Sequence, residues 1–295
     1  MDVSIIMPTY NVEKYVGEAI ESVLSQVFSG SYELLIADDC SSDSTPDILK
    51  SYQAKYPDII KVIFRKHNIG ANPNSYNLCM CASGRYMAFI DADDLWLTTD
   101  KLQNQIDFLE KHNGFGAVCS NAYYIDDKGV KSKKASETKE GLISFNEMIY
   151  GHNDIFCSSF VCRSNLYRKM ADDCTWYIDK GCFNDTVWAF WLSYHNLLYL
   201  MQTPFSAYRV LSNSACHSTD KKKQILLGKR YFMKKICFLF QNDYPIEDKM
   251  DIISKEYNYI VNNALYEGEM KVRKTKTFKI GKRIKALINI FKCQK

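Results

Sequence analysis

The sequence predicts an α/β protein: a mostly parallel β-sheet flanked by helices, with a mainly helical extension at the C-terminal end. Over roughly the first 120 residues, short apolar segments alternate with segments whose apolar residues recur at helical spacing. The segment Tyr86–Ile90 runs without polar interruption, which is typical of a strand buried in a parallel sheet. Two of these segments end abruptly in aspartates, at residues 38–39 and 91–94. Because ligands gather beyond the carboxyl ends of parallel strands, these acids mark a candidate site.

The individual strands and helices follow from local composition. Strands are expected at the apolar, β-prone segments Val3–Met7, Leu34–Ala37, Ile59–Phe64, Tyr86–Ile90 and Ala117–Cys119. Helices are expected at Val16–Leu24, Ser44–Tyr56, Asn74–Ala82 and Lys101–His112. Either Ser44 or Thr45 is expected to cap the second helix, and Pro46 suits its first turn. Since crossovers between parallel strands are right-handed, the strand ends fall on one edge of the sheet.

The pattern becomes mixed α and β after residue 122. The polar, lysine-rich segment Asp126–Glu140 is expected to be a flexible connection. A strand, a helix, two strands and a candidate mobile loop are then predicted at Ile155–Val161, Asn184–His195, Leu197–Met201, Phe205–Leu211 and Ser212–Thr219. We therefore expect one domain over residues 1–212, made of the halves 1–122 and 123–212, and a basic, mainly helical extension over residues 213–295.

Composition and charge exclude several classes of protein. The net charge of +4 is too small to indicate a nucleic-acid partner. The hydrophobic fraction of 46% and the charged fraction of 24% are ordinary for a globular protein with a sizeable core. The 11 cysteines include no CxxC pair, so reduced core thiols are expected. The sequence shows neither a secretory signal pattern nor an apolar segment of membrane-spanning length, and we expect a cytoplasmic protein.

The acidic segment Asp91–Asp94 carries the first chemical argument. Its three carboxylates repel one another unless a cation or a proton compensates them. Mg²⁺ and Mn²⁺ prefer oxygen ligands, and Mg²⁺ often shares one or two carboxylates with substrate phosphates. The alternative is a solvated acidic turn before a helix, where aspartate is favoured. The expected meeting of Pro8–Asn11, Asp38–Asp43 and Asp91–Asp94 at one sheet edge favours a metal and diphosphate site.

Five motifs in series resemble the inverting family 2 glycosyltransferases, which have the GT-A fold. They are SIIMPTYN at Ser4–Asn11, ADDCSSDST at Ala37–Thr45, HNIG at His67–Gly70, GRYMAFIDADD at Gly84–Asp94 and FND at Phe183–Asp185. The resemblance covers about the first 210 residues. It implies a Rossmann-like sheet and transfer of a sugar from a nucleotide-diphosphate sugar, with a UDP-hexose as the expected donor. The expected acceptor is a hydroxyl of a glycan or lipid-linked glycan in bacterial surface polysaccharide synthesis.

The resemblance also implies roles for residues of the donor site. Asp91-Ala92-Asp93 matches the DXD element of the family, in which Asp93, with Asp91, would hold Mn²⁺ or Mg²⁺ at the diphosphate. The other residues that it implies for nucleotide-sugar binding are Pro8, Thr9, Tyr10, Asp38, Asp39, Asn68, Gly70 and Arg209. Tyr10 would face the uracil ring, and Asp39 would accept a hydrogen bond from the base. The alternatives are a surface aromatic side chain and a solvated acidic turn.

Asp185 is the candidate catalytic base. An inverting transfer is a single in-line displacement, and it needs one carboxylate to take the proton of the acceptor hydroxyl. The alternative is that Asp185 only complements the dipole of its helix, with Asn184 as the N-cap. Asp94 is either a second metal ligand or a helix-start residue. His217 is a further candidate for the metal or the diphosphate, and an exposed loop histidine is the alternative.

Two departures from the family pattern keep other functions open. Relatives often have Glu-Asp where this chain has Asn184-Asp185, and an Arg-Asn pair where it has Ser75 and Tyr76. A non-catalytic protein that binds nucleotides or glycans is therefore the main alternative. A sugar-1-phosphate nucleotidyltransferase is less favoured, because Pro8–Asn11 is not the Gly-rich, Arg-bearing loop that it requires. No GxGxxG motif supports a dehydrogenase.

The C-terminal segment Lys279–Lys295 has the pattern of a basic amphipathic helix. Such a helix can lie on an anionic membrane surface, here the inner face of the cell membrane. It can equally dock on its own domain and leave its lysines in solvent.

Overall fold

The computed structural model describes residues 1–150 and 155–211, and beyond them residues 234–235, 237–239, 241–242, 249 and 251–255. The chain divides into two compact units, Met1–Val210 and Leu211–Lys295. Three features predicted from the sequence lie outside the described residues: the loop Ser212–Thr219, the candidate ligand His217 and the basic segment Lys279–Lys295. The expected division into the halves 1–122 and 123–212 and the extension 213–295 stays a prediction.

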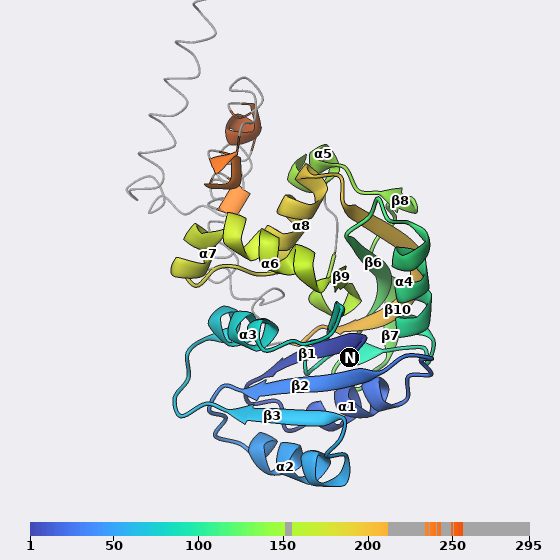
Figure 1. The fold of residues 1–295 in the computed structure, drawn as a ribbon, viewed down its shortest axis with the longest axis vertical. Helices are drawn as coiled ribbons and strands as arrows, with labels where there is room; N and C mark the ends of the chain where they lie inside the picture. The colour runs from blue at the N-terminus through green and yellow to red at the C-terminus, as the bar shows by residue number, and fades with distance from the viewer. Residues whose placement is uncertain are drawn as a thin grey trace, which may run out of the picture. The chain divides into compact units, whose positions relative to one another are not determined.

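The described part of the first unit is organised on one mixed sheet of ten strands (Figure 1). Its path is β3-β2-β1-β4-β9-β6-β10-β5, with β7 paired to β6 and β8 to β10. The strands are β1 (Val3–Thr9), β2 (Tyr32–Asp38), β3 (Ile60–Phe64), β4 (Tyr86–Phe89), β5 (Leu95–Trp96), β6 (Ala117–Ile125), β7 (Lys131–Lys134), β8 (Gly141–Leu142), β9 (Val161–Arg163) and β10 (Leu198–Arg209). β3, β2, β1 and β4 are parallel, and β10 is parallel to β6. The predicted α/β class with a mostly parallel central sheet is confirmed.

The helices fill the connections between these strands. They are α1 (Val16–Leu24), α2 (Thr45–Lys55), α3 (Ala71–Met80), α4 (Lys101–Lys111), α5 (Phe145–Tyr150), α6 (Ser164–Asp173), α7 (Thr175–Asp179) and α8 (Asp185–Tyr194), with a 3-10 turn η1 (Cys157–Ser159). In α1 the residues Val16, Ala19, Ile20 and Val23 are buried, which is the spacing of one helical face. α3 packs on β1 and β2, whereas α1 packs on α2 and β5. Burial of these faces over the strands forms the core.

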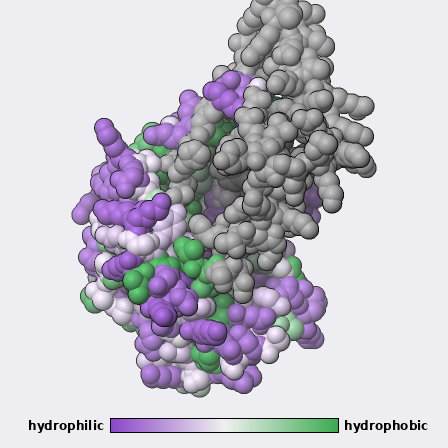
Figure 2. Space-filling model, turned by 180° about the vertical axis from the view of Figure 1, so that it is seen from behind, coloured by the Kyte–Doolittle hydropathy of each residue, from purple (hydrophilic) through white to green (hydrophobic). Residues whose placement is uncertain are grey.

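Large hydrophobic side chains are mostly buried in the described residues. On the face that Figure 2 shows, the surface of the described residues is largely hydrophilic, with small hydrophobic patches between hydrophilic areas. No helix within the described ranges combines the length and the apolar character that crossing a bilayer requires.

Several predicted elements differ from the structure. The expected strand Ile155–Val161 is instead a loop with η1, followed by β9, because Ser159 Oγ donates to the Phe156 carbonyl at 2.7 Å and closes a local turn. The expected flexible connection Asp126–Glu140 contains β7, an exposed lysine-rich edge strand paired with β6. The two strands expected at 197–201 and 205–211 form the single strand β10, whose register shifts around Pro204.

The start of α2 also differs from its predicted cap. Ser44 occupies the N-cap position but makes no side-chain capping bond. Asp43 instead accepts a hydrogen bond from the start of the helix, because its Oδ1 accepts from the Thr45 amide at 2.9 Å. Its Oδ2 accepts from the Glu13 amide at 3.1 Å. Pro46 lies in the first turn as predicted.

Glu33 on β2 is a buried acid that stabilises the sheet. It is 1% exposed, and its carboxylate accepts hydrogen bonds of 2.7 Å from Ser4 Oγ, Ser83 Oγ and Lys61 Nζ. Burial raises the pKa of Glu33. The hydrogen bonds from Lys61, Ser4 and Ser83 and the Lys61 charge outweigh that effect and lower the pKa from the usual 4.5 to about 2.

The lowered pKa of Glu33 predicts a loss of stability in acid. The folded state keeps the carboxylate ionised, so the stabilisation is complete above about pH 4.5 and is lost as the pH falls towards 2. The loss should approach about 3 kcal/mol in the free energy of unfolding. Urea unfolding at a series of pH values measures it. Glu33→Gln should be destabilised at neutral pH and should lose most of this slope, whereas Glu110→Gln, on the surface, should keep it.

Candidate functional site

The loops that follow β1 and β2 lie together at the carboxyl edge of the sheet. The Asp39 amide donates to the Thr9 carbonyl at 2.9 Å, and Thr9 Oγ1 donates to Asp38 Oδ1 at 3.3 Å. Beyond the strands, the Asn11 amide donates to Ser41 Oγ at 2.8 Å. β4 lies on the other side of β1, with Ile6 paired to Phe89, and the acidic segment Asp91–Asp94 follows directly. The structure therefore brings the three predicted loops to one edge.

Asp38 and Asp39 are buried, so the alternative of a solvated acidic turn is wrong. Asp38 is 2% exposed and accepts from the Ser41 amide at 3.0 Å and from Ser41 Oγ at 2.6 Å. Asp39 is 1% exposed, and its two oxygens accept from the Ile69 and Gly70 amides, each at 2.8 Å. A carboxylate has about four acceptor positions, so these bonds leave capacity for a base N–H. The contact with the base stays a prediction.

The turn that Asp39 holds contains two other predicted site residues. Asn68 is exposed, and its Oδ1 accepts from the Gly70 amide at 3.1 Å. Gly70 has φ +94°, a conformation that favours glycine, and it is the N-cap of α3. Of the residues in the β1 loop, Pro8 and Thr9 end the strand and Tyr10 is 50% exposed. Tyr10 therefore has an accessible ring at this edge.

Asp91 and Asp93 are the two carboxylates that the family resemblance predicts as ligands of a cation. Burial, reinforced by the charges of Asp93 and Asp185, raises the pKa of Asp91 to about 7. Burial also raises the pKa of Asp93, and the Arg209 charge opposes this rise. Ala92 between them is 3% exposed and belongs to the core, which fixes the segment to the sheet. Asp91 and Asp93 are both partly buried, and partly buried acids that repel each other are the electrostatic condition that a divalent cation relieves.

Asp94 does not begin a helix, because β5 follows it directly, and its expected role as a second metal ligand stays a prediction. It is 1% exposed, and its oxygens accept from Ser158 Oγ at 2.5 Å and from the Arg209 amide at 2.9 Å. Ser158 Oγ also accepts from the Asp91 amide at 3.0 Å, and the Ser158 carbonyl accepts from Trp96 Nε1 at 3.0 Å. Through these hydrogen bonds Asp94 ties the acid segment to η1 and β10.

Asp185 begins α8, with Asn184 at the N-cap position. Its charge raises the pKa values of both Asp91 and Cys157, so it lies near the acid segment. The loop before α8 is linked to α3, because Asn72 Nδ2 on α3 donates to the Gly181 carbonyl in that loop at 2.9 Å. The structure therefore brings the candidate base to the same region as the candidate metal ligands.

Arg209 has partners other than the expected diphosphate. It is 2% exposed, and its guanidinium donates to the carbonyls of Asp93, Asp126 and Asp127 and to the Glu18 carboxylate. His217 lies outside the described residues. Within the described ranges, no three His, Cys, Asp or Glu side chains are arranged to hold a metal ion by themselves. A cation shared with a diphosphate needs only one or two protein carboxylates.

Sequence reasoning missed Ser158 and Glu18. Ser158 falls in the segment predicted as a strand at Ile155–Val161, and Glu18 falls in the helix predicted at Val16–Leu24. Their partners are 64 and 191 residues away along the chain, so no local pattern could have identified them.

Asp91→Asn is expected to stabilise the metal-free protein. The unfolded chain ionises Asp91 near the usual 3.8 and the folded protein near 7, so stability declines as the pH rises between these values. Asparagine removes that cost, and the melting temperature in EDTA at about pH 8 should rise by several degrees. Differential scanning calorimetry measures the change. The carboxylate of Asp43 accepts backbone hydrogen bonds, so Asp43→Asn should instead lower the melting temperature. A lower melting temperature for Asp91→Asn would contradict the proposed electrostatic cost of the Asp91 charge.

Comparison with known proteins identifies the family. Residues 4–176 match the model of the glycosyl transferase family 2. Escherichia coli WfaP, named a UDP-Glc:alpha-D-GlcNAc-diphosphoundecaprenol beta-1,3-glucosyltransferase, is 33% identical over 191 residues, which are 65% of this chain and 69% of WfaP. The putative glycosyltransferase EpsE of Bacillus subtilis is 41% identical over 133 residues, 45% of this chain and 47% of EpsE. The chain spans less than half of EpsE and of several other curated relatives.

Solved structures share the fold at low sequence identity. S. aureus TarS in complex with UDP-GlcNAc has a TM-score of 0.63 and 18% identity, covering 88% of this chain and 72% of that one. The mannosyltransferase PcManGT from Pyrobaculum calidifontis, in complex with GDP-Man and Mn²⁺, has a TM-score of 0.56 and 14% identity, covering 97% of this chain and 84% of that one. The family match covers more than half of the 295 residues and agrees with the sheet and the order of the motifs, and the protein therefore belongs to glycosyl transferase family 2.

Proposed function

We propose that this protein is an inverting, metal-dependent glycosyltransferase. It would move a sugar from a nucleotide-diphosphate sugar, with a UDP-hexose as the expected donor, to a hydroxyl of a lipid-linked glycan in bacterial surface polysaccharide synthesis. The observation that carries the proposal is that Asp91 and Asp93 follow β4 at the carboxyl edge of the sheet, where the Asp185 charge contributes to the raised pKa of Asp91. WfaP, named for transfer from UDP-Glc to a diphosphoundecaprenol-linked sugar, supports the donor and acceptor classes.

The donor would lie across the loops that follow β1, β2 and β4. Tyr10 offers its exposed ring to the base, and Asp39 offers the acceptor capacity that its two backbone bonds leave. Asp91 and Asp93 would hold Mn²⁺ or Mg²⁺ together with oxygens of the diphosphate, and their partial burial and the repulsion between them fit a cation. A bound divalent cation supplies charge neutralisation to the departing nucleoside diphosphate.

Asp185 would act as the general base of a single displacement. The acceptor oxygen forms a bond to the anomeric carbon as the bond from that carbon to the diphosphate oxygen breaks. The acceptor proton passes to the Asp185 carboxylate, and the electron pair leaves with the nucleoside diphosphate. Because attack and departure occur on opposite sides of the anomeric carbon, its configuration inverts.

Product analysis tests this proposal. The protein with Mn²⁺ is incubated with UDP-hexoses and a lipid-diphosphate-linked sugar acceptor, and the product is examined by mass spectrometry and proton NMR. Addition of one hexose, with the opposite anomeric configuration to the donor, is expected. Retained configuration would overturn the inverting mechanism. Binding of a UDP-sugar with no transfer to any acceptor would favour the non-catalytic alternative.

A further inference from the structure

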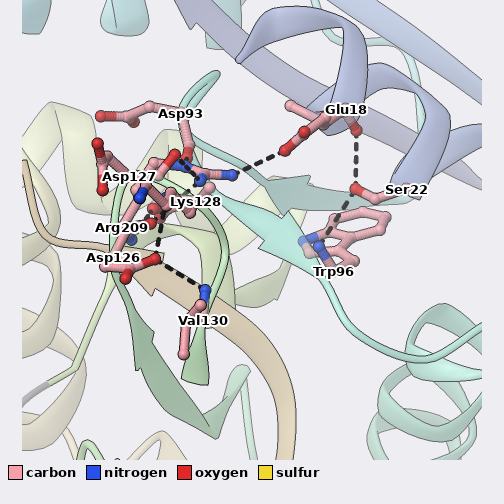
Figure 3. A network of polar contacts seen from close by, with 11 residues as sticks. Glu18, Ser22, Asp93, Trp96, Asp126, Asp127, Lys128, Val130 and Arg209 are labelled. Carbon is pink, nitrogen blue, oxygen red and sulfur yellow. Dashed lines mark hydrogen bonds and ion pairs between the residues drawn. The ribbon is translucent and has the colours of Figure 1, made fainter. Parts of the chain in front are cut away.

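Arg209, the last residue of β10, joins the acid segment to α1 and to the turn that follows β6 (Figure 3). Its Nε donates to the Asp93 carbonyl at 2.8 Å, and its Nη1 to the carbonyls of Asp126 and Asp127, each at 3.2 Å. Its Nη2 donates to Glu18 Oε2 on α1 at 2.9 Å. Figure 3 shows the guanidinium between Glu18 on one side and Asp126 and Asp127 on the other. All three nitrogens of the guanidinium therefore have partners within the protein.

Two further contacts of Arg209 complete the arrangement. The guanidinium carbon lies 4.7 Å from the centroid of the Tyr15 ring, so an aromatic face on the segment before α1 covers it. The Arg209 amide donates to Asp94 Oδ1 at 2.9 Å. Arg209 therefore holds the chain at two neighbouring residues. Its side chain binds the Asp93 carbonyl, and its backbone amide binds the Asp94 carboxylate.

This double attachment determines where the Asp93 side chain can point. The carbonyl of Asp93 and the side chain of Asp94 cannot turn without losing buried hydrogen bonds, and buried donors left unpaired are costly. Arginine suits the position because its planar, rigid set of donors meets several acceptors at fixed angles. A lysine offers a point charge on a flexible chain and cannot bind the Asp93, Asp126 and Glu18 oxygens together.

We propose that Arg209 is a positioning residue, which fixes the backbone at Asp93 so that this carboxylate is presented to the divalent cation and the diphosphate. Glu18 fixes the guanidinium in turn, through an ion pair in which the Arg209 side chain is 1% exposed and the Glu18 side chain 62% exposed. The inference rests on the proposed function. It replaces the direct contact between Arg209 and the diphosphate that the sequence predicts.

Arg163 provides a matched control. It also donates through Nε, Nη1 and Nη2, to the Phe115 carbonyl, the Tyr86 hydroxyl and the Leu109 carbonyl. It lies on β9, opposite Tyr86 at the start of β4, whereas the acid segment follows the end of β4. Arg163→Gln should therefore cost stability through similar bonds without changing the acid segment.

The test compares Arg209→Lys, Glu18→Gln and Arg163→Gln with the unchanged protein, by calorimetric titration of UDP at a series of Mn²⁺ concentrations. Arg209→Lys is expected to raise the Mn²⁺ concentration for half-maximal UDP binding about 10- to 100-fold, as loss of a residue that orients a metal ligand does. Glu18→Gln should raise it less. Arg163→Gln should lower the melting temperature and leave the Mn²⁺ requirement unchanged.

Other outcomes would overturn the inference. An unchanged Mn²⁺ requirement in Arg209→Lys would overturn it. Weaker UDP binding that saturating Mn²⁺ does not restore would also overturn it, because that result indicates direct contact between Arg209 and the diphosphate. If Arg209→Lys does not fold, an unchanged Mn²⁺ requirement in Glu18→Gln would overturn it. Failure of the unchanged protein to bind UDP with Mn²⁺ would instead count against the proposed function.

Discussion

Asp185→Asn is expected to lower turnover by about 10²- to 10⁴-fold and to leave donor affinity nearly unchanged. Asparagine has almost the same shape and still offers an oxygen to the Thr186 amide, which donates to Asp185 Oδ1 at 2.7 Å. It cannot take the proton of the acceptor hydroxyl. Initial rates with saturating UDP-sugar and Mn²⁺, together with calorimetric donor binding, separate the two effects.

Asp172→Asn is the matched control for Asp185→Asn. Asp172 is an exposed residue of α6, so its variant should retain the turnover of the unchanged protein. Turnover of Asp185→Asn within about twofold of the unchanged protein would exclude Asp185 as the base. If turnover and donor affinity fell together, Asp185 would be a donor-binding residue.

Asp93→Asn is expected to abolish the Mn²⁺ dependence of UDP binding and to lower turnover at least about 100-fold. The side chain would lose its charge and one anionic ligand at the position where the diphosphate departs. Titration of UDP with and without Mn²⁺, followed by rates across Mn²⁺ concentrations, measures both effects.

Asp43→Asn serves as the control for Asp93→Asn, because Asp43 lies in a loop at the same edge and its carboxylate accepts from the backbone amides of Glu13 and Thr45. It should lose stability and keep the Mn²⁺ requirement. Unchanged Mn²⁺ dependence in Asp93→Asn would contradict the assignment of Asp93 as a metal ligand.

The sequence was sufficient to predict the central strands and the edge at which the site lies. β1, β2 and β4 are mainly apolar segments that end in polar loops, and this local pattern is decided by burial on both faces of a parallel sheet. α8 was predicted to within a residue at each end, because Asn184 and Asp185 give a clear start before an apolar segment.

The contacts that fix the site were not predictable in the same way. Asp94 is bound by Ser158 and Arg209, which lie 64 and 115 residues away along the chain. The hydrogen bonds from the Ile69 and Gly70 amides to Asp39 likewise depend on tertiary structure. Local periodicity reports which face of an element is buried, whereas these pairs depend on how separate loops meet.

Thermal unfolding with UDP, GDP, dTDP or CDP, each with and without Mn²⁺, tests the central claim most directly. A ligand that binds the folded state at about 100 times its Kd adds about 2.7 kcal/mol of stability, a rise of roughly 5 to 10 °C. We predict this rise for UDP with Mn²⁺ and a small change for UDP alone. A rise with a different nucleotide and Mn²⁺ would overturn the expected donor. No rise with any nucleotide would contradict the donor site at Asp91 and Asp93.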